Sequence, residues 1–200
     1  MNKIFTNSLV SLLLASMPGL AAETDDNAVQ QQYLDESRQT AKAFMQALSS
    51  TLKEQLANNG AESAISVCQH VAPAFAADYS KAGLIVSRVS LKNRNKTLGE
   101  PDAWERSVLE KFDQEKAQAK SVSLMETSAV TEEPDGRWFR YMKAIPTQPM
   151  CLQCHGKTHD ISPEVKAILA KEYPEDSAMG YRVGDIRGAI SIKQKWPIQP

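Results

Sequence analysis

Two cysteines and a histidine stand close enough in the chain to act on one cofactor. Cys151, Cys154 and His155 form the segment Cys-Leu-Gln-Cys-His. Two thiols at this spacing can add to the two vinyl groups of a haem, and the adjacent imidazole can then bind the iron from the same side. In 200 residues with three Cys and three His, the pattern arises by chance on the order of once per thousand shuffles. The segment therefore predicts one covalently attached haem of the c type.

Three other uses of this segment have to be weighed. A thioredoxin-like dithiol would follow a strand and open a helix, whereas the residues that bracket the segment, Pro146, Pro149 and Gly156, predict a loop. Zinc usually needs two pairs of ligands, and the second pair would have to be Cys68 and His159, without a recognised spacing. A structural disulfide between the two cysteines of the segment is the third alternative. We favour the haem over all three.

The second axial position of the iron needs its own candidate. Helical periodicity around Cys68 places its thiol in the middle of an apolar face that also carries Ala72 and Phe75. His70 falls about 200° away, on the polar face. Cys68 is therefore a better candidate than His70, His159 or the methionines. The alternative that Cys68 packs as a small apolar residue stays open at this point.

The first 22 residues have the order of a secretory signal peptide. Lys3 precedes an apolar stretch, and small residues follow before an acidic segment, so we expect cleavage near Ala21 or Ala22. The apolar stretch is short for a membrane span, and no later stretch approaches that length; an uncleaved anchor is the alternative. We therefore expect a periplasmic protein with no membrane span after residues 1–22 are removed, and a single domain over residues 23–200.

Charge and cysteine count narrow the function classes. The chain has 23 Lys and Arg against 24 Asp and Glu, a formal net charge of −1, which argues against a nucleic-acid partner because such surfaces need clustered cations. Three cysteines is an odd number for an exported protein. A haem that uses two of them leaves Cys68 as the remainder.

The apolar pattern changes along the chain from helical to strand-like spacing. It predicts helices over residues 27–58, 61–81, 101–112 and 163–173, with a kink at Pro73 and with Pro101 as a first helical residue. Strands are predicted over residues 84–90, 121–130, 137–145 and 188–193, with a hairpin turn at Pro134-Asp135-Gly136. Helices followed by hairpin-connected strands indicate an α+β fold with an antiparallel sheet and a long N-terminal amphipathic helix.

An ordered set of short motifs resembles the Tll0287-like family of exported haem-binding domains. The motifs are Ala64-Ile65-Ser66-Val67-Cys68, Ala72-Pro73, Arg88-Val89-Ser90, Arg94-Asn95, Pro101-Asp102-Ala103-Trp104-Glu105, Cys151-Leu152-Gln153-Cys154-His155-Gly156 and Gly184-Asp185-Ile186-Arg187-Gly188-Ala189-Ile190-Ser191. The resemblance implies a PAS-like fold, in which helices flank an antiparallel sheet. It also implies a haem with His155 and Cys68 as axial ligands, and it raises the question whether Arg94 or Asn95 approaches the haem propionates.

These observations together predict a binding protein and favour it over an enzyme. A haem ligated on both faces would carry electrons or sense a redox state or a small ligand. The alternative is a small peroxidase-like haem enzyme, or an oxidoreductase subunit, with an open distal site. No output domain follows Trp196-Pro197, so we expect a separate redox or signalling protein as partner.

Overall fold

Four strands form one antiparallel sheet, and helices lie on both of its faces. The computed structural model describes residues 19–81 and 83–196. Its helices and helical turns are α1 (Gly19–Ser66), η1 (Val67–Val71), α2 (Ala72–Tyr79), α3 (Lys96–Gly99), α4 (Ala103–Ala117), η2 (Val122–Leu124), η3 (Pro149–Cys151), α5 (Leu152–His155) and α6 (Pro163–Glu172). The strands β1 (Leu84–Val89), β2 (Glu126–Glu133), β3 (Gly136–Pro146) and β4 (Ile186–Lys195) lie in the order β1-β4-β3-β2. The predicted α+β fold, with a sheet flanked by helices and a long N-terminal helix, is confirmed.

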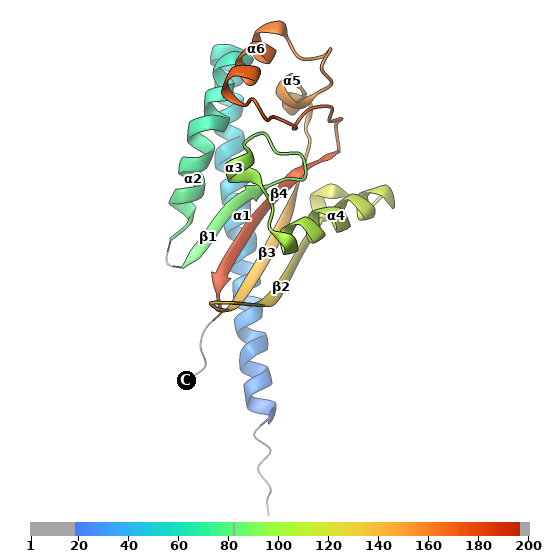
Figure 1. The fold of residues 1–200 in the computed structure, drawn as a ribbon. Coiled ribbons are helices and arrows are strands. Elements are labelled where there is room, and N and C mark those ends of the chain that lie inside the picture. The colour runs from blue at the N-terminus through green and yellow to red at the C-terminus, as the bar shows by residue number, and fades with distance from the viewer. Residues whose placement is uncertain (1–18, 82, 197–200) are drawn as a thin grey trace, which may run out of the picture.

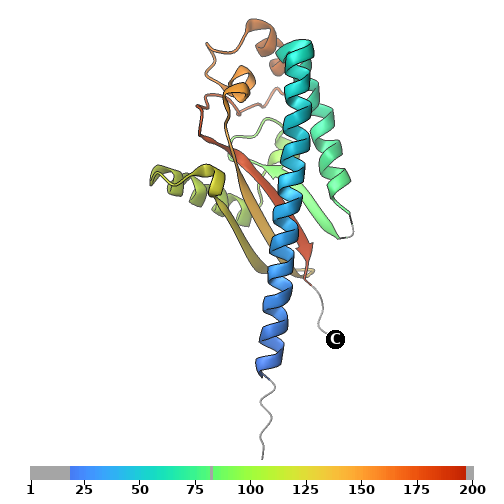
Figure 2. The ribbon, with the colours of Figure 1, turned by 180° about the vertical axis from the view of Figure 1, so that it is seen from behind.

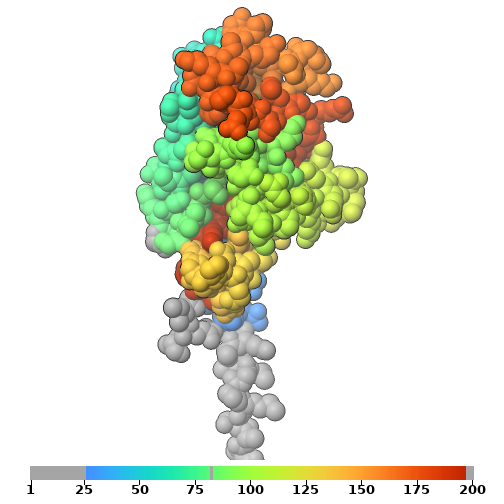
Figure 3. All heavy atoms as spheres, viewed as in Figure 1, coloured from blue at the N-terminus to red at the C-terminus, as the bar shows by residue number. Residues whose placement is uncertain are grey.

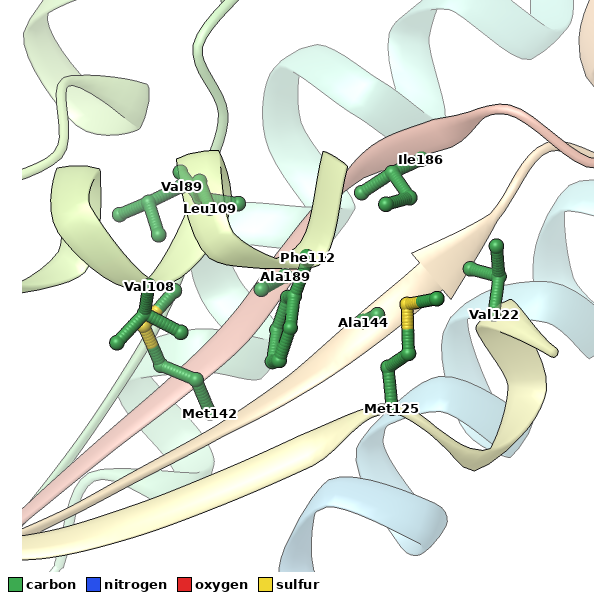
Figure 4. Close-up of a cluster of buried hydrophobic side chains, with 10 residues drawn as sticks. All are labelled: Val89, Val108, Leu109, Phe112, Val122, Met125, Met142, Ala144, Ile186 and Ala189. Atoms are coloured by element: carbon green, nitrogen blue, oxygen red, sulfur yellow. The ribbon is translucent and has the colours of Figure 1, made fainter. Parts of the chain in front are cut away.

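The sheet is buried on both faces. α1 and α2 lie against one face and α4 against the other (Figure 1, Figure 2). Successive residues of a strand point to opposite faces, so in β3 the rings of Phe139 and Tyr141 join the core on the α1 side. Met142 and Ala144 join Phe112 and the rest of the core under α4 (Figure 4). Each face of the sheet is therefore held by its own helix layer.

A third cluster closes the end of the molecule at which α5 and α6 lie. Val165 and Leu169 of α6 are buried there together with Ile65 of α1 and Tyr173, and Cys154 packs against them. The orange segments of α5 and α6 form this end in the space-filling view (Figure 3). The Cys-x-x-Cys-His segment is thereby packed next to the end of α1.

The helical segments α1, η1 and α2 follow one another along the chain and contain two irregularities. Gly60, with φ 77° and ψ 176°, interrupts the helical backbone of α1, and glycine adopts such a conformation more readily than other residues. Just before Pro73, where a kink is predicted, the helix contains the π-helical turn η1, in which the N–H of Ala72 donates to the carbonyl of Val67. Pro73 has no N–H to donate, and it occupies the first turn of α2, where none is needed.

The predicted starts of α4 and β2 are wrong. Pro101 is not the first residue of its helix: Asp102 caps α4 in a capping box with Glu105, so Pro101 lies outside it. The predicted strand over residues 121–130 begins only at Glu126, after the 3₁₀ turn η2. In a strand, Val122 and Met125 would point to opposite faces. The turn lets both side chains enter the core under α4.

Most of the predicted signal peptide lies outside the described residues, which begin at Gly19 with α1. None of the helices in the described ranges is both long enough and apolar enough to span a membrane. Export, the cleavage site and the periplasmic location remain predictions from the sequence.

Candidate functional site

One cavity brings together the four side chains that the sequence singles out. Cys68, Cys151, Cys154 and His155 all line a cavity of about 360 Å³. Most of the remaining wall is apolar and includes Met45, Leu48, Leu52, Val67, Val86 and Ile145. Three arginines also line it: Arg88, Arg94 and Arg187. The cavity therefore combines sulfur and imidazole donors with apolar walls and positive charge, which suits a large apolar cofactor that carries negative groups.

The Cys-x-x-Cys-His segment is helical, so the loop predicted for it is wrong. The 3₁₀ turn η3 begins at Pro149 and continues directly into α5. Pro149 opens this turn because the first residue of a helix needs no N–H donor, and Gly156 lies just past its end. Residues three and four apart share one face of a helix. Cys151, Cys154 and His155 therefore project from the same side.

The ring of His155 is fixed by a backbone carbonyl. Its Nδ1 lies 2.7 Å from the carbonyl oxygen of Ala178, and because a carbonyl can only accept, Nδ1 carries the proton and Nε2 keeps its lone pair. Burial lowers the pKa of His155 well below its usual range, and the Arg187 and Arg94 cations lower it further. The imidazole is thus neutral at pH 7 and oriented, as a metal ligand must be. Arg187 Nε donates to His155 Nε2 at 3.3 Å, and a metal on Nε2 would replace that contact.

The surroundings of the thiols argue against the other uses of the segment. Burial raises the pKa of the Cys154 thiol more than the nearby Arg94 cation lowers it, so this thiol stays protonated at pH 7. All three cysteines, each in a described part of the chain, are free thiols, so Cys151 and Cys154 form no disulfide. His159 does not join a zinc site with them, because it is exposed and lies 3.2 Å from the carboxylate of Asp160.

The helical turn η1 places Cys68 and His70 in different surroundings. Cys68 lines the cavity, close to the end of α1 and to the Cys-x-x-Cys-His segment. His70 is exposed and does not line the cavity. The separation expected from helical periodicity is present, although η1 is a π-helical turn and brings Val67 rather than Cys68 into full burial.

Arg94 supports the segment from the loop between β1 and α3. Its guanidinium forms an ion pair with Asp176 at 2.9 Å, and both side chains are only 6% exposed. Arg94 also donates to the carbonyl oxygen of Cys154. Asp176 accepts the backbone N–H of Ala178 at 2.7 Å, and Ala178 holds His155. Arg94 therefore helps to position the imidazole, while Asn95 caps α3 by accepting the N–H of Leu98.

Neither Ala178 nor Asp176 was singled out from the sequence. Ala178 acts through its backbone carbonyl, which no side-chain type can reveal. Asp176 lies in the segment between α6 and β4, far along the chain from Arg94, and only the fold brings the pair together. The Arg94-Asn95 motif was the one available signal for this part of the site.

Comparisons with known proteins agree with this fold. The family model described as Tll0287-like matches residues 29–194. Among solved structures, the crystal structure of the cyanobacterial haem protein Tll0287 is similar with a TM-score of 0.59 and 24% sequence identity, over 85% of this chain and 96% of that chain. No curated protein matches the chain. At this level of identity, the structural likeness shows a common fold.

Proposed function

The chain belongs to the Tll0287-like family, and on this premise we propose that it is an exported protein with one covalently bound haem, which carries electrons or senses a redox state or a small ligand. The similar structure is that of a haem protein. The observation that carries the proposal is the cavity in which Cys151, Cys154, His155 and Cys68 meet.

The donor set of the cavity supports covalent attachment. Cys151 and Cys154 project from one face of a short helix, where their thiols can form two thioether bonds to one macrocycle. His155 would offer Nε2 to the iron, because Nδ1 is held by the Ala178 carbonyl, and that hydrogen bond makes the imidazole a stronger donor. When bound, haem supplies an iron that gains and loses single electrons.

Cys68 is the side chain that would decide how the iron behaves. It lines the cavity from η1, an element separate from the helix that carries His155. As a thiolate it would donate electron density, stabilise ferric iron and lower the reduction potential. If both His155 and Cys68 bound the iron, no open site would remain for oxygen or peroxide. This favours electron transfer or sensing over catalysis, with a separate periplasmic protein as the redox or signalling partner.

The absorption and EPR spectra of the ferric protein test this assignment. We expect a six-coordinate, low-spin spectrum with thiolate features, and Cys68→Ala should abolish those features and raise the reduction potential. His70→Ala is the matched control, because His70 lies two residues away on the exposed side and should leave the spectrum unchanged. An unchanged Cys68→Ala spectrum would remove Cys68 as ligand. A five-coordinate, high-spin spectrum of the unsubstituted protein would favour an open distal site and the enzyme alternative.

A further inference from the structure

Two of the three arginines that line the cavity have no carboxylate partner. Arg94 is paired with Asp176. Arg88 and Arg187 form no ion pair with any Asp or Glu in the parts of the chain that the structure describes. Charged groups that are partly withdrawn from water, as Arg88 and Arg187 are, are normally paired, because an unpaired charge there destabilises the fold. Two cations in the wall of the cavity therefore lack an anionic partner among the described residues.

The fold directs both side chains into the cavity. Arg88 lies two residues after Val86 in β1, so the two share a face, and Val86 is buried on the α1 side. Arg187 is the extra residue of a β-bulge, because β3 pairs Ile145 with Gly188 and then Pro146 with Ile186. A bulge turns one side chain away from the regular alternation of its strand. Both arginines consequently line the cavity from adjacent strands.

The contacts of Arg187 leave its charge without a counter-charge. Its Nη1 donates to the hydroxyl of Ser90 at 3.3 Å and to the backbone carbonyl of Lys92 at 3.4 Å, and its Nε donates to the neutral ring of His155. None of these acceptors is negative. Its guanidinium also lies over the ring of Tyr181, with Cζ 5.5 Å from the ring centroid. A carboxylate at this position would supply the missing counter-charge.

We propose that Arg88 and Arg187 bind the two carboxylates of the haem and so fix the orientation of the macrocycle in the cavity. This assignment rests on the proposed function. The vinyl groups of haem, which would bond to Cys151 and Cys154, are uncharged, whereas its two propionates are carboxylates, and their number matches the two unpaired cations. A guanidinium binds a carboxylate with two parallel hydrogen bonds, which gives direction as well as charge. Arg94 does not serve this purpose, because it is already committed to Asp176.

The test compares two probes in one host. The host is the full chain with Cys151→Ala and Cys154→Ala, which has to bind porphyrins without thioether bonds. The probes are haemin and haemin dimethyl ester, in which both carboxylates are esterified and uncharged. In the host, the ester should bind roughly 10–100-fold more weakly than the acid, the usual range for losing charged hydrogen bonds. Adding Arg88→Gln and Arg187→Gln should lower this ratio to about 1–3, because the acid then loses its advantage.

Two further variants separate recognition from folding. Arg88→Lys with Arg187→Lys keeps both charges and should retain part of the ratio. Arg106→Gln is the matched control, since Arg106 pairs with Glu100 at the surface of α4 and does not line the cavity. An ester that binds the host as well as the acid does, or a ratio that survives both glutamine substitutions, would overturn the assignment and leave the haem site standing. A host that takes up neither porphyrin would count against the proposed function itself.

Discussion

Replacing Asp176 by alanine should destabilise the protein strongly, although Asp176 contacts no expected ligand of the iron. Asp176 pairs with Arg94 at 2.9 Å, and each side chain is only 6% exposed. Removing one partner of a buried ion pair leaves the other charge uncompensated, which typically costs about 3–5 kcal/mol. For a chain of this size a loss of 1 kcal/mol lowers Tm by roughly 2–4 °C, so we expect a decrease of roughly 6–20 °C.

The assay is chemical and thermal unfolding of the apoprotein. The control variant removes a second ion pair, which links the same two parts of the chain as the pair between Arg94 and Asp176. Glu175→Ala breaks the ion pair between Lys96 and Glu175, whose side chains are 62% and 66% exposed. Exposed pairs of this kind contribute little to stability, so Glu175→Ala should leave Tm almost unchanged. The two substitutions lie next to each other in the chain and differ mainly in the burial of the pair that each one removes.

A double-mutant comparison checks the cause. In an Arg94→Met background no charge is left behind, so Asp176→Ala should cost clearly less than it does in the unsubstituted chain. Equal costs in the two backgrounds, or a loss no larger than that of Glu175→Ala, would refute the explanation based on a buried, uncompensated cation.

Two further predictions concern pH and the β-bulge. Burial, assisted by the nearby Cys68, raises the pKa of Tyr173 to about 12, above the value of about 10 in an unfolded chain. The folded state therefore holds this proton more tightly than the unfolded state does. The free energy of unfolding should fall by up to roughly 3 kcal/mol as pH rises from 10 to 12. Urea unfolding across this range should show a smaller decrease for Tyr173→Phe, and an identical decrease would contradict the assignment. Gly188 has a φ of 151°, which alone costs another residue about 1–3 kcal/mol. Gly188→Ala should destabilise the protein by more than this, because the added Cβ would also overlap the carbonyl oxygen of Val89. Gly184→Ala, with a φ of 84° and no neighbour within 4 Å of the added Cβ, should lower Tm less, and the reverse order would contradict the role of that overlap.

The features that the sequence predicted correctly depend on short-range spacing. The sheet strands follow from alternating and β-branched residues, and the hairpin of β2 and β3 follows from its turn residues. The different surroundings of Cys68 and His70 follow from helical periodicity alone, since the two residues lie in one helical segment. Cys151, Cys154 and His155 are identified by the spacing of the Cys-x-x-Cys-His segment alone, although the helix that places them on one face is not predicted.

The features that were missed depend on long-range pairing or on backbone atoms. The direction of Arg187 results from a bulge in the pairing of β3 with β4, and an isolated strand pattern does not contain that information. Its neighbouring Gly188 was a weak local signal, because a glycine within a strand often marks a bulge. The helix that carries the segment is not predicted because proline usually breaks a helix, although proline is favoured at the first position of one, where Pro149 lies.

The measurement that tests the central claim most directly is intact-protein mass spectrometry of the exported chain. The chain is produced together with the machinery for attaching haem and is denatured before analysis, so that only covalent haem is retained. We predict the mass of one haem per chain, no covalent haem when Cys151→Ala and Cys154→Ala are combined, and full attachment in Cys68→Ala. An unsubstituted chain that leaves the denaturing step without added mass would contradict the claim that Cys151 and Cys154 hold a haem.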